Sequence, residues 1–282
     1  MKKMISGLLV LCLLLSLATC AMADGVITTK DKGYRDLSEP GTIIQGEGYT
    51  IELVLTGTEG KRIFGRLYTP EDFDPAGSYT AMVLNHGGGN NADFWDKFMA
   101  PEFTKAGYVC FAYDCRSAQE GGRGSYGDPT ESGKATMASY TEDMCTALDY
   151  VETLDFVDKE NIYVMGNSMG GGAVQSGAAR RSDEIAGMIV MYGSLAEDNK
   201  SMLDNYDEVR ANPYHNGEVL FIQGSKDTAL PAERTLENME WYEQSSFVFI
   251  DGAPHGFGRE PNRPALIAVG VIIDFIQRNS NK

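Results

Sequence analysis

From Tyr79 onward, short apolar runs rich in β-branched and aromatic residues alternate with segments long enough to form helices. Runs of this kind are typical of buried parallel strands, which need long crossover connections, usually helices. The expected strands are Ala81–Asn85, Val109–Asp114, Ile162–Met165, Met188–Tyr192, Val219–Gln223 and Phe247–Ile250. The expected helices lie at about 94–106, 139–154, 169–181, 231–243 and 262–278.

Upstream of this region, apolar and polar residues alternate one by one in Tyr49–Leu55 and Ile63–Tyr68, on either side of a turn at Gly57–Gly60. This pattern predicts an antiparallel hairpin with one covered face. We therefore expect an α/β fold with a mostly parallel central sheet flanked by helices, and an N-terminal antiparallel hairpin. The polar stretch 193–217 forms at most a small lid over the sheet, and an ordinary surface loop explains it equally well.

The first 23 residues have the layout of an export signal. Lys2 and Lys3 precede the apolar run Leu8–Leu17, and Ala21-Met22-Ala23 supplies the small residues that signal peptidase recognises. We expect cleavage near Ala23 and a secreted or extracytoplasmic protein. A lipoprotein tethered through Cys20 is the alternative. The run is short for a membrane span, and no later segment resembles one.

Residues 24–47 lack periodicity and are expected to form an irregular arm, whereas 48–282 shows no linker or repeat and predicts one domain. The chain has 40 acidic and 24 basic residues, with a net charge of −16. Such a surface repels nucleic acids, anionic membranes and polyanionic substrates. The sequence leaves the oligomeric state open.

Three cysteines lie beyond the export signal, namely Cys110, Cys115 and Cys145. Their spacing matches no metal site, and Cys110 falls in an apolar run, where we expect it to be buried. A disulfide between Cys115 and Cys145 is left open by the sequence. The three histidines are far apart, and no dinucleotide-binding pattern follows the first strand, so we expect neither a metal nor a cofactor.

The segment Gly166-Asn167-Ser168-Met169-Gly170 matches a nucleophile elbow, in which glycines on either side of a serine permit a tight turn from strand to helix. The pentapeptide alone is a weak signal, and a glycine-rich turn with a solvated serine is the alternative. Its context strengthens it, because an expected strand precedes it and an expected helix with small residues follows it. We therefore predict that Ser168 is a nucleophile.

A serine nucleophile needs a base and an acid to orient that base. Of the three histidines, His255 follows an expected strand, which places it at the sheet edge expected to carry Ser168. Asp227 likewise follows a strand, and the order serine, aspartate, histidine is the one used by the nucleophile-elbow fold. Asp251 is the competing acid, and a turn-capping role is the alternative for Asp227.

The segment His86-Gly87-Gly88-Gly89 comes directly after the first expected parallel strand. Glycines let the backbone approach a substrate closely, so their N–H groups can bind a developing oxyanion. We expect the two oxyanion donors to be the N–H groups of Gly88 and Met169. His86 is interpreted as a residue that orders this loop rather than as a base.

Together these features resemble the α/β-hydrolase superfamily over about residues 48–282. Within it, the chain looks most like dienelactone-hydrolase and prolyl-oligopeptidase-like esterases and bacterial cinnamoyl (feruloyl) esterases. Those relatives often have His where this chain has Asn167, and Gly where it has Ser117. The resemblance rests on His86–Gly89, Asp114–Ser117, Gly166–Gly171, Gly224–Asp227 and His255–Phe257.

The resemblance implies a serine esterase that transfers an acyl group to water through an acyl-enzyme. Its expected substrates are short acyl or aryl (cinnamoyl) esters, either small molecules or esters attached to polysaccharides. The alternatives are a serine peptidase or other acyl hydrolase of the same fold, or a non-catalytic exported binding protein. Phe94, Trp95 and Phe98 are expected to pack in the core, with a pocket-lining role as the alternative.

Overall fold

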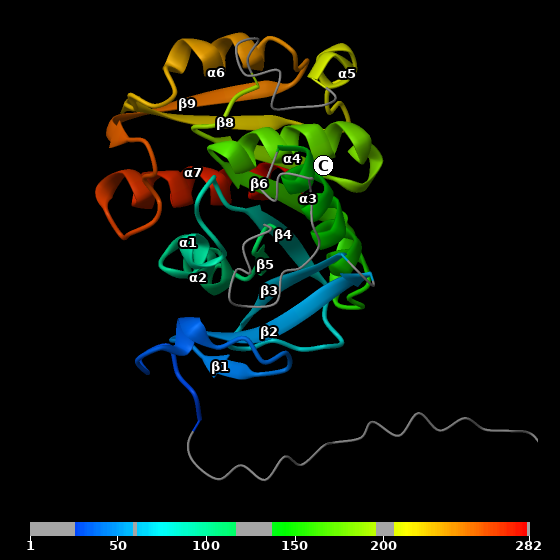
Figure 1. Ribbon diagram of the computed structural model, residues 1–282, viewed down its shortest axis with the longest axis vertical. Coiled ribbons are helices and arrows are strands. Elements are labelled where there is room, and N and C mark those ends of the chain that lie inside the picture. The colour runs from blue at the N-terminus through cyan, green and yellow to red at the C-terminus, as the bar shows by residue number, and fades with distance from the viewer. Residues whose placement is uncertain (1–25, 59–60, 117–136, 196–205, 281–282) are drawn as a thin grey trace, which may run out of the picture.

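A computed structural model describes residues 26–58, 61–116, 137–195 and 206–280 of the chain. Its central feature is one nine-stranded sheet with the strand order β1-β2-β3-β5-β4-β6-β7-β8-β9. In Figure 1 the sheet runs from β1 and β2 at the bottom to β8 and β9 at the top. The expected export signal, with Cys20, and Ser117 lie outside the described residues.

The antiparallel end of the sheet comes first in the chain. Strands β2 (Tyr49–Thr58) and β3 (Lys61–Pro70) form the expected hairpin, with Ile51 opposite Tyr68. The arm at 24–47 is less irregular than expected. Its residues Ile43–Gln45 form β1, which pairs antiparallel with β2. The side chain of Ile44 is fully buried, while those of its two neighbours in the strand face solvent. A short 3₁₀ helix, η1 (Tyr34–Asp36), precedes β1.

The remaining strands are parallel, as the sequence predicts. β3 pairs antiparallel with β5, and from there every neighbouring pair runs in the same direction. All their carboxyl ends therefore lie at one edge of the sheet. These strands are β4 (Tyr79–Asn85), β5 (Val109–Tyr113), β6 (Val157–Asn167), β7 (Gly187–Met191), β8 (Val219–Lys226) and β9 (Ser245–Pro254).

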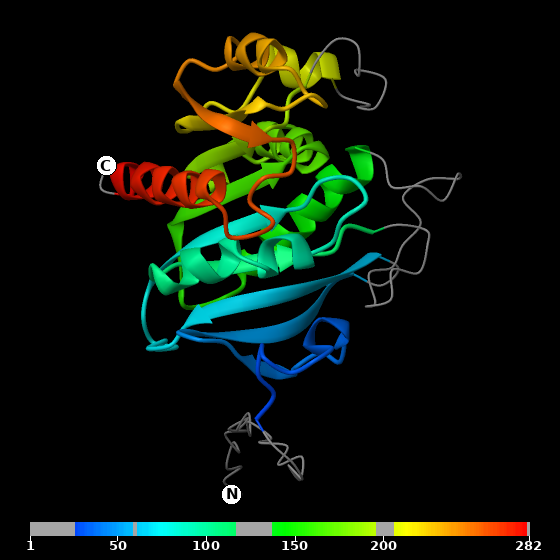
Figure 2. The same cartoon turned by 90° about the vertical axis from the view of Figure 1, so that its left-hand side faces the viewer.

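Helices cover both faces of the sheet (Figures 1 and 2). One face packs against α1 (Asp93–Asp96), α2 (Met99–Lys105) and α7 (Arg263–Asn279). The other face packs against α3, α4 and α5. The same hydrophobic cluster includes Met239, Trp241 and Tyr242, at and just after the end of α6. These four helices are α3 (Met137–Glu152), α4 (Met169–Arg180), α5 (Tyr206–Ala211) and α6 (Ala232–Met239). α5 lies in the polar stretch 193–217, of which residues 196–205 are outside the described part of the chain.

The single helix expected at 94–106 is wrong, because the segment divides into α1 and α2. The break falls at Phe98, whose φ of −156° and ψ of −61° are not helical. Pro101 then lies in the first turn of α2, where its missing N–H costs no hydrogen bond. The break lets both short helices bury their apolar side chains against the sheet.

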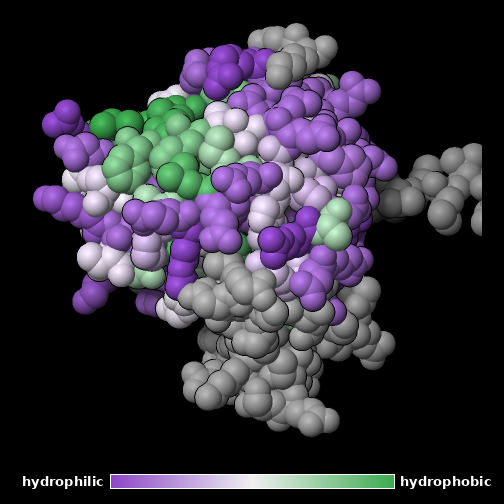
Figure 3. Space-filling view, turned by 90° about the horizontal axis from the view of Figure 1, so that it is seen from above, coloured by the Kyte–Doolittle hydropathy of each residue, from purple (hydrophilic) through white to green (hydrophobic). Residues whose placement is uncertain are grey.

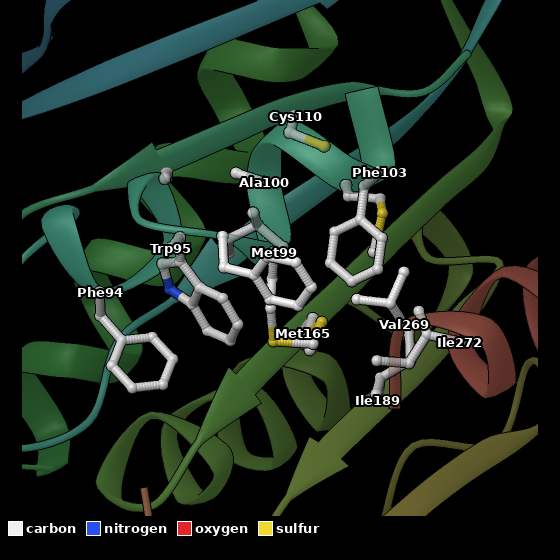
Figure 4. Close-up of a cluster of buried hydrophobic side chains, with 14 of the residues drawn as sticks. Phe94, Trp95, Met99, Ala100, Phe103, Cys110, Met165, Ile189, Val269 and Ile272 are labelled. Carbon is white, nitrogen blue, oxygen red and sulfur yellow. The ribbon is translucent and has the colours of Figure 1, made fainter. Parts of the chain in front are cut away.

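The preferred core role of Phe94, Trp95 and Phe98 is confirmed, because they are only 3%, 0% and 8% exposed. Figure 4 shows Phe94 and Trp95 beside Met99 and Phe103, facing residues of β6, β7 and α7. This cluster fixes the position of the loop that follows β4, because α1 and α2 begin directly after it.

Most of the surface seen from above is polar, and one apolar patch interrupts it (Figure 3). In the C-terminal part of the chain, the exposed large apolar side chains are Leu236 on α6, Phe249 on β9 and Leu266 and Ile267 on α7. None of the described helices combines the length and the hydropathy that a membrane span requires.

Candidate active site

Ser168 lies on a sharp turn between β6 and α4, at the carboxyl edge of the sheet. Its backbone has a φ of 52° and a ψ of −121°, a conformation that a non-glycine residue rarely adopts. A Cβ at Gly166 would lie 2.2 Å from Gly170 O, and one at Gly170 would lie 2.5 Å from Asn85 O. Glycine is therefore required at both positions, and the pattern reflects this close packing of strand, turn and helix.

The three residues predicted as a triad lie in hydrogen-bond contact. His255 Nε2 lies 3.0 Å from Ser168 Oγ, and His255 Nδ1 lies 2.8 Å from Asp227 Oδ2. In this arrangement Ser168 donates to His255, and His255 donates to Asp227. The three come from the ends of β6, β8 and β9, so parallel strands bring together residues up to 87 positions apart.

Asp227 is held in a buried pocket of hydrogen-bond donors. Its side chain is 0% exposed, although His255 is 30% exposed. Besides His255, it accepts from Gln223 Nε2 at 3.1 Å and from the N–H groups of Ala229 and Leu230 at 2.9 and 2.8 Å. These hydrogen bonds satisfy the carboxylate oxygens and fix the direction of the side chain. The competing Asp251 instead accepts from Ser225 Oγ at 3.2 Å, so the structure does not bring it to the histidine.

The glycine loop after β4 lies against the serine turn. A Cβ at Gly87 would lie 3.1 Å from Ser168 Cβ, and one at Gly88 would lie 3.4 Å from Met169 Sδ. Among the described residues, neither the Gly88 N–H nor the Met169 N–H finds an acceptor. The Met169 N–H also opens α4, where the helix dipole favours negative charge. Both groups are therefore available to a developing oxyanion.

His86 links the loop to the neighbouring strand. It is 1% exposed, its Nε2 accepts from the Cys115 N–H at 3.0 Å, and its Nδ1 lies 2.8 Å from Gly87 O. Both ring nitrogens are used, so His86 orders the loop, as the sequence indicated. His215 lies away from the triad, bonded to Pro213 O at 3.2 Å and exposed.

Three residues near the site were missed by sequence reasoning. Asn167 Oδ1 accepts from the Gly87 N–H at 3.1 Å, which holds the glycine loop. Gln223 orients Asp227, as described above. Tyr192 packs its ring 4.9 Å from that of His255, and its hydroxyl donates to Phe257 O at 2.8 Å. For two of them the available signal was position, because Asn167 ends β6, which carries Ser168, and Gln223 lies on β8, which carries Asp227. Tyr192 follows β7, which carries no candidate residue, so no such signal pointed to it.

The thiols take no part in this arrangement. Cys110, Cys115 and Cys145 are free, and the expected burial of Cys110 is found. Burial raises the pKa of Cys110 to about 12, which keeps it a thiol. Within the described ranges, no group of His, Cys, Asp and Glu side chains has the arrangement of a metal site.

A family model described as the alpha/beta hydrolase fold matches residues 80–214 of the chain. An uncharacterised protein of Escherichia coli K12, YcjY, is 28% identical over 191 residues, which covers 62% of this chain and 60% of that protein. A second uncharacterised Escherichia coli protein is 26% identical and covers 44% of both chains. The chain thus spans about half to three fifths of the length of these curated relatives.

Solved structures are similar over most of the chain. Est1E from Butyrivibrio proteoclasticus superimposes with a TM-score of 0.62 at 18% identity, covering 82% of this chain and 99% of that one. An acetyl xylan esterase from Paenibacillus sp. R4 has a TM-score of 0.65 at 17% identity, covering 84% and 87%. The resemblance and fold class inferred from the motifs are confirmed. The chain is a protein of the α/β-hydrolase fold.

Proposed function

We propose that this protein is a serine esterase in which Ser168, His255 and Asp227 form the catalytic triad. The observation that carries this proposal is the continuous hydrogen-bond chain from Ser168 Oγ through His255 to the buried Asp227. A turn-capping aspartate or a solvated serine would not need this alignment. The N–H groups of Gly88 and Met169 beside the serine, which have no acceptor among the described residues, add the second part of an acyl-transfer site.

In the proposed reaction, Ser168 Oγ attacks the ester carbonyl carbon while His255 Nε2 takes the hydroxyl proton. The carbonyl oxygen gains negative charge, and the N–H groups of Gly88 and Met169 stabilise it. The intermediate collapses when the bond to the alcohol breaks and His255 returns the proton to the departing oxygen. Water, activated by the same histidine, then attacks the acyl-enzyme and releases the acid and Ser168.

Asp227 has a supporting part in both half-reactions. It accepts from His255 Nδ1, so Nε2 remains the basic nitrogen that faces Ser168. It also offsets the positive charge on the imidazolium that forms after proton transfer. The donors from Gln223, Ala229 and Leu230 keep the carboxylate from rotating away.

We propose short acyl or aryl esters as the substrates, including those attached to polysaccharides. The similar structures support this class, because one is an acetyl xylan esterase and Est1E has been solved with ferulic acid bound. The likeness to solved structures is below 25% identity, so it supports the fold directly and the substrate only by analogy.

We also propose that the protein acts outside the cytoplasm, because residues 1–23 have the composition of an export signal. The test is the N-terminal sequence of the protein recovered from the native cell. A terminus at Asp24 supports export, acylated Cys20 supports tethering, and an intact Met1 contradicts both.

The catalytic proposal is tested with purified protein and Ser168→Ala on 4-nitrophenyl esters of increasing acyl length, methyl ferulate and dipeptide amides. We expect hydrolysis of at least one ester series by the wild type and a loss of about a thousandfold or more in the variant. Faster cleavage of the amides would identify a peptidase instead. Equal rates for wild type and variant on every compound would overturn the triad.

A further inference from the structure

We propose that the protein has a second ligand site, which binds a neutral sugar ring at the edge of the sheet opposite to the candidate active site. The site is a cavity of about 240 Å³ between the loops that precede β8 and β9, residues 212–218 and 240–244. The cavity therefore lies at the amino ends of these two strands. The length of β8, roughly 25 Å, separates it from Asp227.

The loop before β8 forms one wall of the cavity, and hydrogen bonds to the segment before β7 hold it in place. Ser182 Oγ accepts from the N–H groups of His215 and Asn216, each at 3.1 Å. The buried hydroxyl of Tyr214 donates to Ile185 O at 3.0 Å. Because this wall is already fixed, a ligand would bind to it with little loss of conformational entropy.

Trp241, just after α6, contributes to the opposite wall. Its ring meets that of Tyr206 at 5.5 Å in a T-shaped contact, and the Arg210 guanidinium lies 5.8 Å from its centroid. These contacts hold the indole, which stays partly exposed. Its Nε1–H has no acceptor among the described residues. An aromatic surface with a free donor suits the C–H groups and hydroxyls of a sugar ring.

Four polar side chains also line the cavity, namely those of Asn212, His215, Glu243 and Gln244. Asn212, Glu243 and Gln244 are exposed, and their side chains make no hydrogen bond to any residue that the structure describes. When His215 Nδ1 donates to Pro213 O, its Nε2 is left as an acceptor. The cavity thus combines amide donors with carboxylate and imidazole acceptors. A sugar hydroxyl both donates and accepts, so neighbouring hydroxyls match such a mixed set.

Charge and size select the class of ligand. Glu243 in the lining and Arg210 beside Trp241 have opposite charges, so the site favours neither an anion nor a cation. The net charge of −16 further disfavours an anion. The volume of about 240 Å³ lies below the range of about 300–1,000 Å³ that drug-sized ligands occupy. A single neutral sugar ring, as part of a longer glycan, meets these conditions.

Sugar binding at this cavity needs no catalytic residue, so the inference goes beyond the proposed esterase function. It rests on that function only in its consequence, which is that the protein stays on a polysaccharide while Ser168 acts on its esters. The competing explanation is that the cavity is only a gap between two loops and binds no ligand.

The two tryptophans of the chain provide a direct test, because Trp95 is 0% exposed and Trp241 lines the cavity. Ester-free xylohexaose, cellohexaose and mannohexaose are titrated into the purified protein, with hexagalacturonate as the acidic counterpart. Calorimetry measures affinity, and quenching of tryptophan emission by acrylamide reports the access to Trp241. The proteins compared are the wild type, the double variant Asn212→Ala/Glu243→Ala, Trp241→Phe and Glu237→Ala.

We expect at least one neutral hexasaccharide to bind the wild type with a Kd of about 1 mM or below, and to protect Trp241 from acrylamide. The double variant should weaken this binding about tenfold or more, because it removes two hydrogen-bonding groups. Trp241→Phe should retain part of the affinity and lose the protection signal. Glu237→Ala removes a carboxylate from α6, outside the lining, so it should bind like the wild type.

Three outcomes would overturn the site. They are the lack of binding by every neutral hexasaccharide at millimolar concentration, binding that the double variant and Trp241→Phe both retain in full, and binding of hexagalacturonate as tight as that of the neutral sugars. Both side chains replaced in the double variant are exposed, and a melting curve verifies that it is folded. If it is unfolded, Trp241→Phe decides, because unchanged affinity there contradicts the site. These measurements involve no turnover, so a failure of the esterase proposal leaves their result unaffected.

Discussion

Asp96 on α1 and Asp227 after β8 are both buried carboxylates, but their hydrogen-bond partners differ in kind. Both side chains are 0% exposed, and both receive hydrogen bonds from several directions. Asp227 accepts from a histidine that in turn contacts Ser168 at the solvent-facing edge of the sheet. One of its partners can therefore gain and lose a proton during a reaction.

Asp96, on α1, has partners that keep their protons. It accepts from the hydroxyls of Tyr34 and Tyr68 at 2.7 and 2.8 Å, and it pairs with Arg35 at 2.6 Å and Arg66 at 3.3 Å. Burial and the charge of Asp96 raise the pKa of both tyrosines well above their usual range. This cluster joins the N-terminal arm to β3 and α1, and nothing in it can serve as a nucleophile.

The difference shows that burial and the number of donors do not identify a functional carboxylate. Permanent cations and phenols around Asp96 offset its charge and link distant segments, which is a structural role. A single imidazole aligned with a serine makes Asp227 a candidate for catalysis. The chemistry of the partners therefore separates the two, and mutations should separate them as well.

Asp227→Asn should give the largest effect. The amide cannot accept from His255 in the same way and favours the wrong tautomer, so we expect turnover to fall by about ten-thousandfold. Thermal unfolding should change little, because the shape is kept. Initial rates on a 4-nitrophenyl ester and a melting curve measure both. A normal rate together with a large loss of stability would show that Asp227 has a structural role and not a catalytic one.

Asp96→Asn should show the opposite pattern. The change removes the carboxylate charge that Arg35 and the fully buried Arg66 share, while Arg66 keeps its ion pair with Asp93. We therefore expect the free energy of unfolding to fall by about 3 kcal/mol, the low end for a broken buried ion pair. Turnover at 25 °C should stay within about threefold of wild type while the variant is folded. Urea unfolding checks the first expectation, and a fall in turnover similar to that of Asp227→Asn would contradict the second.

Asp143 on α3 offers a third case, because among the described residues a single arginine, Arg116, bonds it. Burial raises the pKa of Asp143 from 3.8 to about 6, against the opposing effect of Arg116. The folded state thus binds this proton more tightly than the unfolded chain. Its stabilisation is fully present below about pH 4 and is lost as the pH rises through about 6.

Asp143→Asn should remove this contribution to the pH dependence. The difference in unfolding free energy between wild type and variant should change by at most about 3 kcal/mol, mostly between about pH 4 and pH 6. Urea unfolding of both proteins across that range measures it. A constant difference from pH 4 to pH 7 would show that the pKa of Asp143 is not raised.

Tyr192→Phe should have the smallest effect. It keeps the ring against His255 but loses the hydroxyl that donates to Phe257 O, so the base loop is held less firmly. We expect kcat to fall about tenfold with little change in KM, because the substrate contacts are kept. Tyr214→Phe is the matched control, since its buried hydroxyl donates to Ile185 O at 3.0 Å, before β7 begins. Equal losses in both variants would point to general destabilisation.

Much of this arrangement could be predicted from the sequence, for a physical reason. Parallel strands put their carboxyl ends at one edge, so residues just past three strands were expected together, and the structure brings Ser168, Asp227 and His255 into contact. Strand order could not be predicted, because apolar runs do not say that β5 lies between β3 and β4. The Asp96 cluster was also missed, since its members are brought together only by tertiary packing.

We propose that Ser168 is the nucleophile, that His255 is its base, and that Asp227 rather than Asp96 orients this base. The most direct measurement is the rate and position of covalent labelling by a fluorophosphonate, mapped by peptide mass spectrometry. We predict label on Ser168 in the wild type and in Asp96→Asn, much slower labelling in Asp227→Asn, and none in Ser168→Ala. Label on another residue, or equal labelling of Ser168→Ala, would contradict the claim.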